Sequence, residues 1–198
     1  MIREDGMPGG RPRSFDADAA LDRALEVFWQ HGYEGTSLTD LTAAMGINKP
    51  SLYAAFGNKE ELFAKVLARY LDGPGAYTAD ALDAPTGREV VKQLIHGAVG
   101  LTAGQNTPQG CLCVSSVHAR GPEAHTVRQD AIAVRKAGEA ALRRRLERAT
   151  DLPSRYEPAA LAALVQTISD GIAVQAAAGR SHDELRQIAD LALRALLD

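Results

Sequence analysis

The sequence predicts an all-α protein. Apolar side chains recur at helical spacing through most of the chain, and glycine or proline separates the periodic segments. No stretch alternates apolar and polar residues over a useful length, although the run LCVSSV at 112–117 fits a strand as well as a helix. We therefore expect one compact chain of two helical parts.

Composition limits the possible classes of protein. A chain of 198 residues with a net charge of −3 has no overall basic character, so any attraction to phosphate must be local. Two cysteines only one residue apart indicate a reducing compartment. The N-terminus is polar and no apolar run approaches the roughly 20 residues of a membrane span. We expect a cytoplasmic protein that has no membrane association and no cofactor.

The N-terminal segments begin and end with recognisable signals. Residues 1–14 carry glycine and proline but no apolar periodicity, and we interpret them as a flexible arm. A helix of about four turns is predicted from Asp16 to Gly32. A short second helix follows, capped by Thr36 or Ser37 and ended by Gly46.

The third predicted helix is short and polar. Asn48 can cap it, Pro50 is tolerated in its first turn, and Gly57 ends it. A fourth helix starts at Asn58, with Glu61 completing a capping box.

The remaining chain is predicted to be helical after a linker. Residues 71–87, LDGPGAYTADALDAPTG, read as an irregular connection. Helical patterns then cover about 87–103, a short stretch from about 111, 122–149, 157–178 and 182–197. We place the domain boundaries at 1–14 for the arm, 15–60 for the first domain and 61–198 for the second.

The second and third helices have the layout of a helix-turn-helix, whose second helix enters the major groove of DNA. From Leu41 to Lys59 there are two lysines and no acidic residue, which suits an approach to phosphate. Arg11 and Arg13 could reach a neighbouring groove as N-terminal arms do. Short amphipathic helix pairs are also common in all-α proteins, so half-buried Tyr53 and solvated lysines remain the alternative reading.

Residues 16–62 resemble the DNA-binding domain of the TetR family (TetR/AcrR-like) of transcriptional regulators. The matching pieces, in order, are Phe28, Gly32-Tyr33, Gly35-Thr36-Ser37, Leu41…Met45-Gly46-Ile47, Ser51-Leu52-Tyr53…Phe56 and Lys59-Glu60-Glu61-Leu62. The resemblance implies a three-helix helix-turn-helix domain followed by a C-terminal helical domain for ligand binding and dimerisation. It also implies a homodimer, a partly palindromic double-stranded operator and a small-molecule effector of unknown identity.

The resemblance assigns roles to particular positions. Thr36 and Ser37 are similar to phosphate contacts or caps of the second helix. Tyr53 and Lys59 resemble phosphate contacts. The face of the recognition helix is implied to consist of Asn48, Lys49, Pro50, Ser51 and Leu52.

The last two predicted helices are expected to form the dimer interface. Their apolar stripes are wider than one core requires, which favours an intermolecular four-helix bundle. The alternative is that the stripes only close their own domain. The predicted interface residues are Leu161, Leu164, Val165, Ile168, Ile172, Leu185, Ile188, Leu191 and Leu196.

The segment TPQGCLCVSSVH at 107–118 carries the remaining chemistry. Cys111 and Cys113 lie at an expected helix start with His118 nearby, and a thiol in such a place can have a lowered pKa. We interpret these three residues as candidates for effector or redox sensing, while a packed, inert Cys111 is the alternative. The five histidines show no close ligand spacing, so no metal site is predicted.

Three functions follow from these observations. The first is a non-enzymatic repressor, released from its operator by an effector or by cysteine modification. The second is a thiol-dependent enzyme such as a peroxidase, with Cys111 as nucleophile and Cys113 or His118 assisting. The third is a helical scaffold that only dimerises and has no affinity for DNA.

Overall fold

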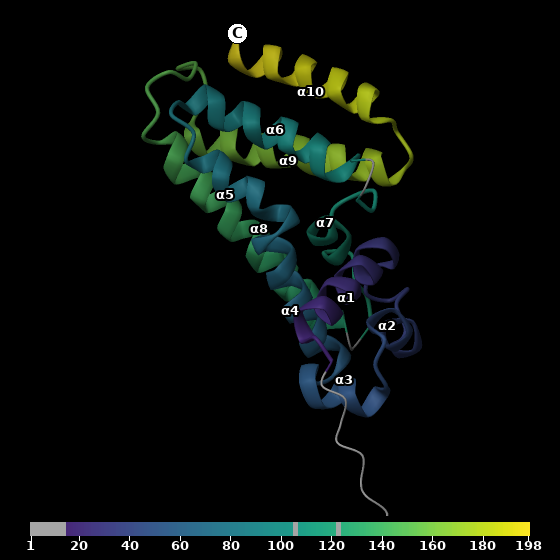
Figure 1. Ribbon diagram of the computed structural model, residues 1–198. Coiled ribbons are helices and arrows are strands. Elements are labelled where there is room, and N and C mark those ends of the chain that lie inside the picture. The colour runs from purple at the N-terminus through teal and green to yellow at the C-terminus, as the bar shows by residue number, and fades with distance from the viewer. Residues whose placement is uncertain (1–14, 105–106, 122–123) are drawn as a thin grey trace, which may run out of the picture.

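The protein is all-helical in the ranges that its computed structural model describes, which are residues 15–104, 107–121 and 124–198. Figure 1 shows α1–α3 at one end of an elongated molecule and α6, α9 and α10 at the other, with α4 and α8 running between them. The expected arm, including Arg11 and Arg13, lies outside the described residues, as does Pro122 near the predicted start of α8.

The first four helices form where their caps predict. They are α1 (Ala17–His31), α2 (Leu38–Met45), α3 (Lys49–Phe56) and α4 (Lys59–Asp72). Ser37 and Asn58 each form a capping box, with Asp40 and Glu61 respectively. Gly46 adopts the left-handed conformation, at φ +68°, that closes α2 and allows the tight turn into α3.

The C-terminal part contains more helix than expected. The 3-10 helix η1 (Pro74–Ala76) and α5 (Tyr77–Leu82) occupy the segment predicted as an irregular linker. This prediction was wrong because Ala81 is buried and α5 packs on α6, a tertiary gain that outweighs the local glycine and proline signals.

The remaining helices follow the predicted ranges closely. They are α6 (Gly87–Thr102), α7 (Leu112–Ser116), α8 (His125–Leu146), α9 (Pro158–Ala177) and α10 (His182–Leu197). The ambiguous run at 112–117 is therefore helical. α9 has the length and hydropathy of a membrane span, contrary to the expectation that no apolar run comes close, but core helices of soluble proteins pass the same test.

Two hydrophobic clusters hold the structure. The first, here called the head core, joins α1–α4 to α7 and the start of α8; the second joins α6, the end of α8, α9 and α10. In the head core, Phe28 is fully buried and meets the ring of Phe63 edge-on, with centroids 5.1 Å apart. The proposed boundary between residues 60 and 61 falls inside α4, whose buried residues belong to the head core.

Replacing Phe28 by alanine should test the head core. We expect Phe28→Ala to lower the free energy of unfolding by about 3–5 kcal/mol, because it removes a ring that contacts both α4 and the loop after α1. Urea denaturation followed by circular dichroism measures this loss. The matched control on the same helix is Gln30→Ala, an exposed position where a change of only about 0.5 kcal/mol or less is expected. Equal effects of the two substitutions would contradict this assignment of the core.

Candidate nucleic-acid interface and internal cavity

α3 presents a polar face because only one side of it is needed for packing. Leu52 and Phe56 are buried in the head core, while Lys49 and Pro50 are exposed and Ser51 is half-buried. Tyr53 keeps 48% of its surface exposed, so the alternative of a buried Tyr53 is not what the structure shows. A short helix with this exposed face can lie in a major groove.

Two residues assigned to this surface by resemblance have other roles. Leu52 is fully buried, so its side chain packs in the head core and does not face outward. Thr36 is also buried, and its hydroxyl donates to the carbonyl oxygen of Gly32 at 2.7 Å. The cap of α2 is therefore Ser37, which exchanges hydrogen bonds with Asp40.

The remaining polar residues lie around the two helix starts. The side-chain oxygen of Asn48 accepts from the backbone N–H of Ser51 at 2.9 Å, so Asn48 is first of all the cap of α3. Lys59, at the start of α4, has its ammonium 4.3 Å from the centroid of the Tyr33 ring. Lys65 donates to the last carbonyl of α3, that of Phe56, at 2.9 Å. Sequence reasoning missed Lys65, which is separated from α3 by the start of α4.

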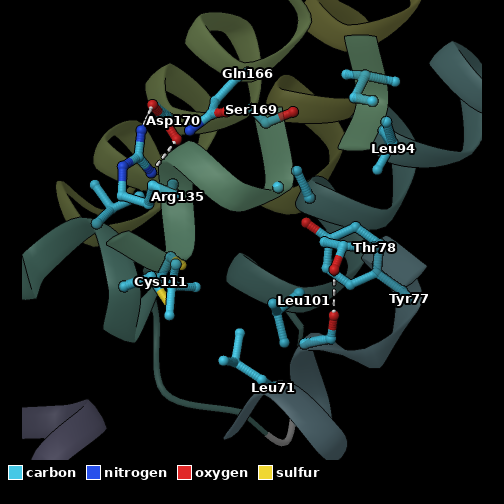
Figure 2. A pocket seen from close by; sticks show the side chains of 18 of the residues that line it. Leu71, Tyr77, Thr78, Leu94, Leu101, Cys111, Arg135, Gln166, Ser169 and Asp170 are labelled. Atoms are coloured by element: carbon cyan, nitrogen blue, oxygen red, sulfur yellow. Dashed lines mark hydrogen bonds and ion pairs between the residues drawn. The ribbon is translucent and has the colours of Figure 1, made fainter. Parts of the chain in front are cut away.

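A cavity of about 400 Å³ lies between the head core and the C-terminal helices. Figure 2 shows its polar side, formed by Arg135, Gln166, Ser169 and Asp170, and its apolar walls, to which Leu71, Leu94 and Leu101 contribute. Its size and its few convergent polar groups are typical of a small-molecule site.

The polar side of the cavity is an ion pair between α8 and α9. The guanidinium of Arg135 donates to both carboxylate oxygens of Asp170, and the Nη1–Oδ1 distance is 2.7 Å. This pairing raises the pKa of Arg135, so the guanidinium stays charged beside the carboxyl group that it contacts. Sequence reasoning missed the pair because its members are 35 positions apart and neither stands in a motif.

Both cysteines line the same cavity. The hydroxyl of Tyr70 donates to Cys111 Sγ at 3.2 Å, and Cys113 is buried beside it. A hydrogen bond from the Cys113 thiol, helped by those from Tyr70 and the backbone N–H of Val114, lowers the pKa of Cys111 against the opposing effect of burial. The same contact raises the pKa of Cys113, so Cys111 is the thiolate-forming member of the pair.

His118 does not join the cysteines. Its side chain is exposed beyond the end of α7 and is not among the residues that line the cavity. The sequence suggested a place near Cys111 because both residues lie in the same short segment of the chain, but α7 ends at Ser116. No histidine therefore accompanies the thiol among the described residues that line the cavity, and the Asp170 carboxylate there is paired with Arg135. The described ranges of the chain also contain no cluster of three or more residues suited to a metal ion.

The predicted dimer stripe divides into two sets. Leu161, Val165, Ile172, Leu185 and Leu196 are buried within their own chain, as expected for side chains that close their own domain. Leu164, Ile188 and Leu191 are exposed, and Ile168 is half-buried. Val174, 52% exposed on α9, is a further large apolar residue that sequence reasoning missed. We call Leu164, Val174, Ile188 and Leu191 the exposed apolar patch.

Comparison with known proteins places this geometry in a family. Residues 20–66 match the family model of bacterial regulatory proteins, tetR family. The chain is 35% identical over 191 residues to the HTH-type transcriptional repressor ComR of Escherichia coli K12, covering 93% of this chain and 90% of ComR. It is 30% identical to the transcriptional repressor BdcR of the same organism, covering 94% of this chain and 92% of BdcR.

A solved structure agrees with these relatives. A cysteine mutant of the TetR family transcriptional regulator CifR, complexed with 26-base-pair double-stranded operator DNA, is 42% identical, with a TM-score of 0.87 over 93% of this chain and 99% of that chain. The matches extend over nearly the whole chain. They agree with the exposed polar face of α3 and the helix-turn-helix that supports it, which are the features of a DNA-binding regulator. The chain belongs to the TetR family and is a DNA-binding transcriptional repressor, not an enzyme.

Proposed function

We propose that the protein acts as a homodimer on a partly palindromic operator and is released by a small effector, or by modification of Cys111, in the cavity. The observation that carries the proposal is the exposed polar face of α3, held outward by buried Leu52 and Phe56. The complex of CifR with its operator supports double-stranded DNA as the partner. The proposal divides the chain into a DNA-reading part up to about residue 60 and a sensing and dimerising part beyond it.

The proposed DNA contacts are polar groups around α2 and α3. Lys49, Pro50, Ser51 and Tyr53 face outward from α3, and Ser37 and Lys59 stand at the neighbouring helix starts, where backbone N–H groups favour phosphate. Asn48 contributes as the cap that orients the start of α3. We retain Arg11 and Arg13 as proposed arm contacts.

The proposed dimer uses the exposed apolar patch. Two recognition helices must sit about 34–36 Å apart to read successive major grooves, so a rigid interface is needed at the far end of the molecule. Leu164, Val174, Ile188 and Leu191 lie on α9 and α10, at the end opposite α3 (Figure 1). Large apolar side chains that stay exposed on two helices packed together favour self-association.

Release is proposed to work by a shift of population. An effector that prefers a conformation with wrongly spaced reading helices lowers operator affinity by its differential affinity for the two states. α4 links the two ends, because its first turns lie in the head core and Tyr70 reaches the cavity. The cavity favours a compact, mostly apolar effector with a polar group for Arg135, Asp170 or Gln166. We place this activity in the cytoplasm, where the DNA is.

Substitutions at the proposed interface should separate phosphate contacts from base contacts. We expect Lys59→Ala to weaken binding to all duplexes alike and to reduce the salt slope by about 1, because one phosphate contact is lost. Lys49→Ala or Ser51→Ala should instead alter sequence preference. Fluorescence anisotropy on an operator obtained by selection from random duplexes, at two salt concentrations, measures both effects. Lys92→Ala on α6 is the control, and wild-type behaviour of all three variants would show that the face is wrongly assigned.

A charge placed in the exposed apolar patch should break the dimer. Leu191 is 62% exposed, so Leu191→Glu should leave the fold intact but cost about 2 kcal/mol or more of dimerisation free energy. Sedimentation velocity should then show monomer, and operator affinity should fall. Gln129→Glu adds the same charge at an exposed position of α8 and should stay dimeric. A dimeric Leu191→Glu variant would exclude this interface.

The thiol of Cys111 should react at lower pH than an ordinary cysteine. Because hydrogen bonds stabilise its thiolate, the rate of alkylation by iodoacetamide should rise with a midpoint below the usual value of about 8.5. Tyr70→Phe removes one of these bonds and should move the midpoint upward. Mass spectrometry of the adduct against Cys111→Ser locates the reaction. A midpoint at or above 8.5, or modified protein that keeps full operator affinity, would remove cysteine modification from the mechanism.

A further inference from the structure

The segment Gly110–Gly121 belongs to the DNA-reading head as much as to the sensor. Leu112, Cys113 and Ala119 are buried in the head core together with α1 and α4. The backbone N–H of Arg120 also donates to the carboxylate of Glu34, in the loop between α1 and α2. The cysteines therefore lie on a segment that is already packed against the helices that carry α3.

Gly110 joins α6 to α1 through its backbone and lies close to α9. Its N–H donates to the carbonyl of Thr102 at the end of α6, at 2.9 Å. Its own carbonyl accepts from the indole N–H of Trp29 on α1, also at 2.9 Å and buried. Its φ of +93° suits glycine, and a Cβ there would come within 3.1 Å of Ala177 on α9. Any displacement of this residue must alter its contact with α1.

Trp29 meets Cys111 by a second route. The ring of Tyr70 contacts the Trp29 indole edge-on, with centroids 4.9 Å apart and planes at 88°. The hydroxyl of the same tyrosine donates to Cys111 Sγ. Cys111 is also the covalent neighbour of Gly110. It is therefore connected to the Trp29 indole twice, by its side chain through Tyr70 and by its main chain through Gly110.

We propose that Trp29 is a positioning residue that transmits the state of Cys111 to the DNA-reading head through α1, in addition to the route along α4. This inference rests on the proposed release by modification of Cys111. α1 packs directly on α2, and α2 packs on α3, so a change at Trp29 reaches the recognition helix through two packed contacts. Packing of this kind shifts between discrete arrangements and does not deform continuously.

The physical driver is the cost of a buried unpaired donor. A group added to Cys111 occupies the space beside Tyr70. It also removes the thiolate to which the Tyr70 hydroxyl donates its hydrogen bond. If Gly110 moves in response, the buried Trp29 N–H loses its acceptor, which is unfavourable unless α1 moves with it. If Tyr70 moves, its edge-on contact with the indole is lost. The modified protein therefore favours a different position of α1.

The chain carries a spectroscopic reporter for this coupling. Trp29 is its single tryptophan, so fluorescence excited at a wavelength that the five tyrosines do not absorb reports this site alone. Iodoacetamide is the probe: the Cys111 sulfur forms a bond to the methylene carbon, the carbon–iodine bond breaks and iodide leaves. We expect the emission of the wild-type protein to shift on modification, and that of Cys111→Ser, treated identically, to stay unchanged. Unchanged emission in singly modified wild type would overturn the inference, even if a Trp29 variant failed to fold.

The functional test compares operator Kd before and after modification. Wild type should lose affinity about tenfold or more, within the usual range of allosteric coupling. Trp29→Phe keeps an aromatic ring but lacks the donor, so its ratio of modified to unmodified Kd should be clearly smaller than that of wild type, with the route along α4 accounting for what remains. Tyr156→Phe is the matched control, since it too removes an aromatic donor to a backbone carbonyl, that of Ala195, and it should keep the wild-type ratio.

The outcomes separate two failures. If wild type and Trp29→Phe are released equally, the role of Trp29 is wrong while release by cysteine modification stands. If wild type keeps its affinity after Cys111 is fully modified, release by cysteine modification is wrong and the inference falls with it. If Tyr156→Phe loses the coupling as well, the effect is a general loss of rigidity and the assignment to Trp29 is overturned.

Discussion

Burial of one face of α4 is the constraint on which the rest of the structure depends. Leu62, Phe63 and Val66 fill the head core, and Tyr70, two turns further on, lies between Trp29 and Cys111. A helix of 14 residues spans about 21 Å, so one rigid element belongs to both the DNA-reading end and the cavity. The two ends cannot change independently, because moving α4 disturbs the packing of each.

The reading head separates packing from recognition. Side-chain caps accept hydrogen bonds from backbone N–H groups in the first turns of α2, α3 and α4. The starts of these helices are therefore stabilised without the outward side chains of α3. Leu52 and Phe56 are the buried side chains of α3. Its outward positions are therefore free to change without loss of stability, which is what a recognition surface requires if related repressors are to read different operators.

The cavity combines a neutral wall with a reactive thiol. Because Arg135 and Asp170 pair with each other, this side of the cavity offers donors and acceptors without an unpaired charge, and an uncharged effector can enter without losing strong hydration. Cys111 stands where the cavity meets the head core, with a lowered pKa and a partner, Tyr70, that is itself kept neutral by burial. Small-molecule binding and thiol chemistry thus act on the same set of packed contacts.

Caps, glycine stops and apolar spacing are local signals, and from them the helical class, the helix limits of the reading head and the polar face of α3 could be predicted. The sequence by itself did not determine α5, where burial outweighs glycine and proline, or the division of the α9 and α10 stripes into buried and exposed residues. The sequence also did not predict the contact of Arg135 with Asp170, 35 positions apart, or that of Trp29 with Gly110, 81 positions apart. Those contacts depend on how helices distant in sequence pack together, and only the tertiary structure decides that.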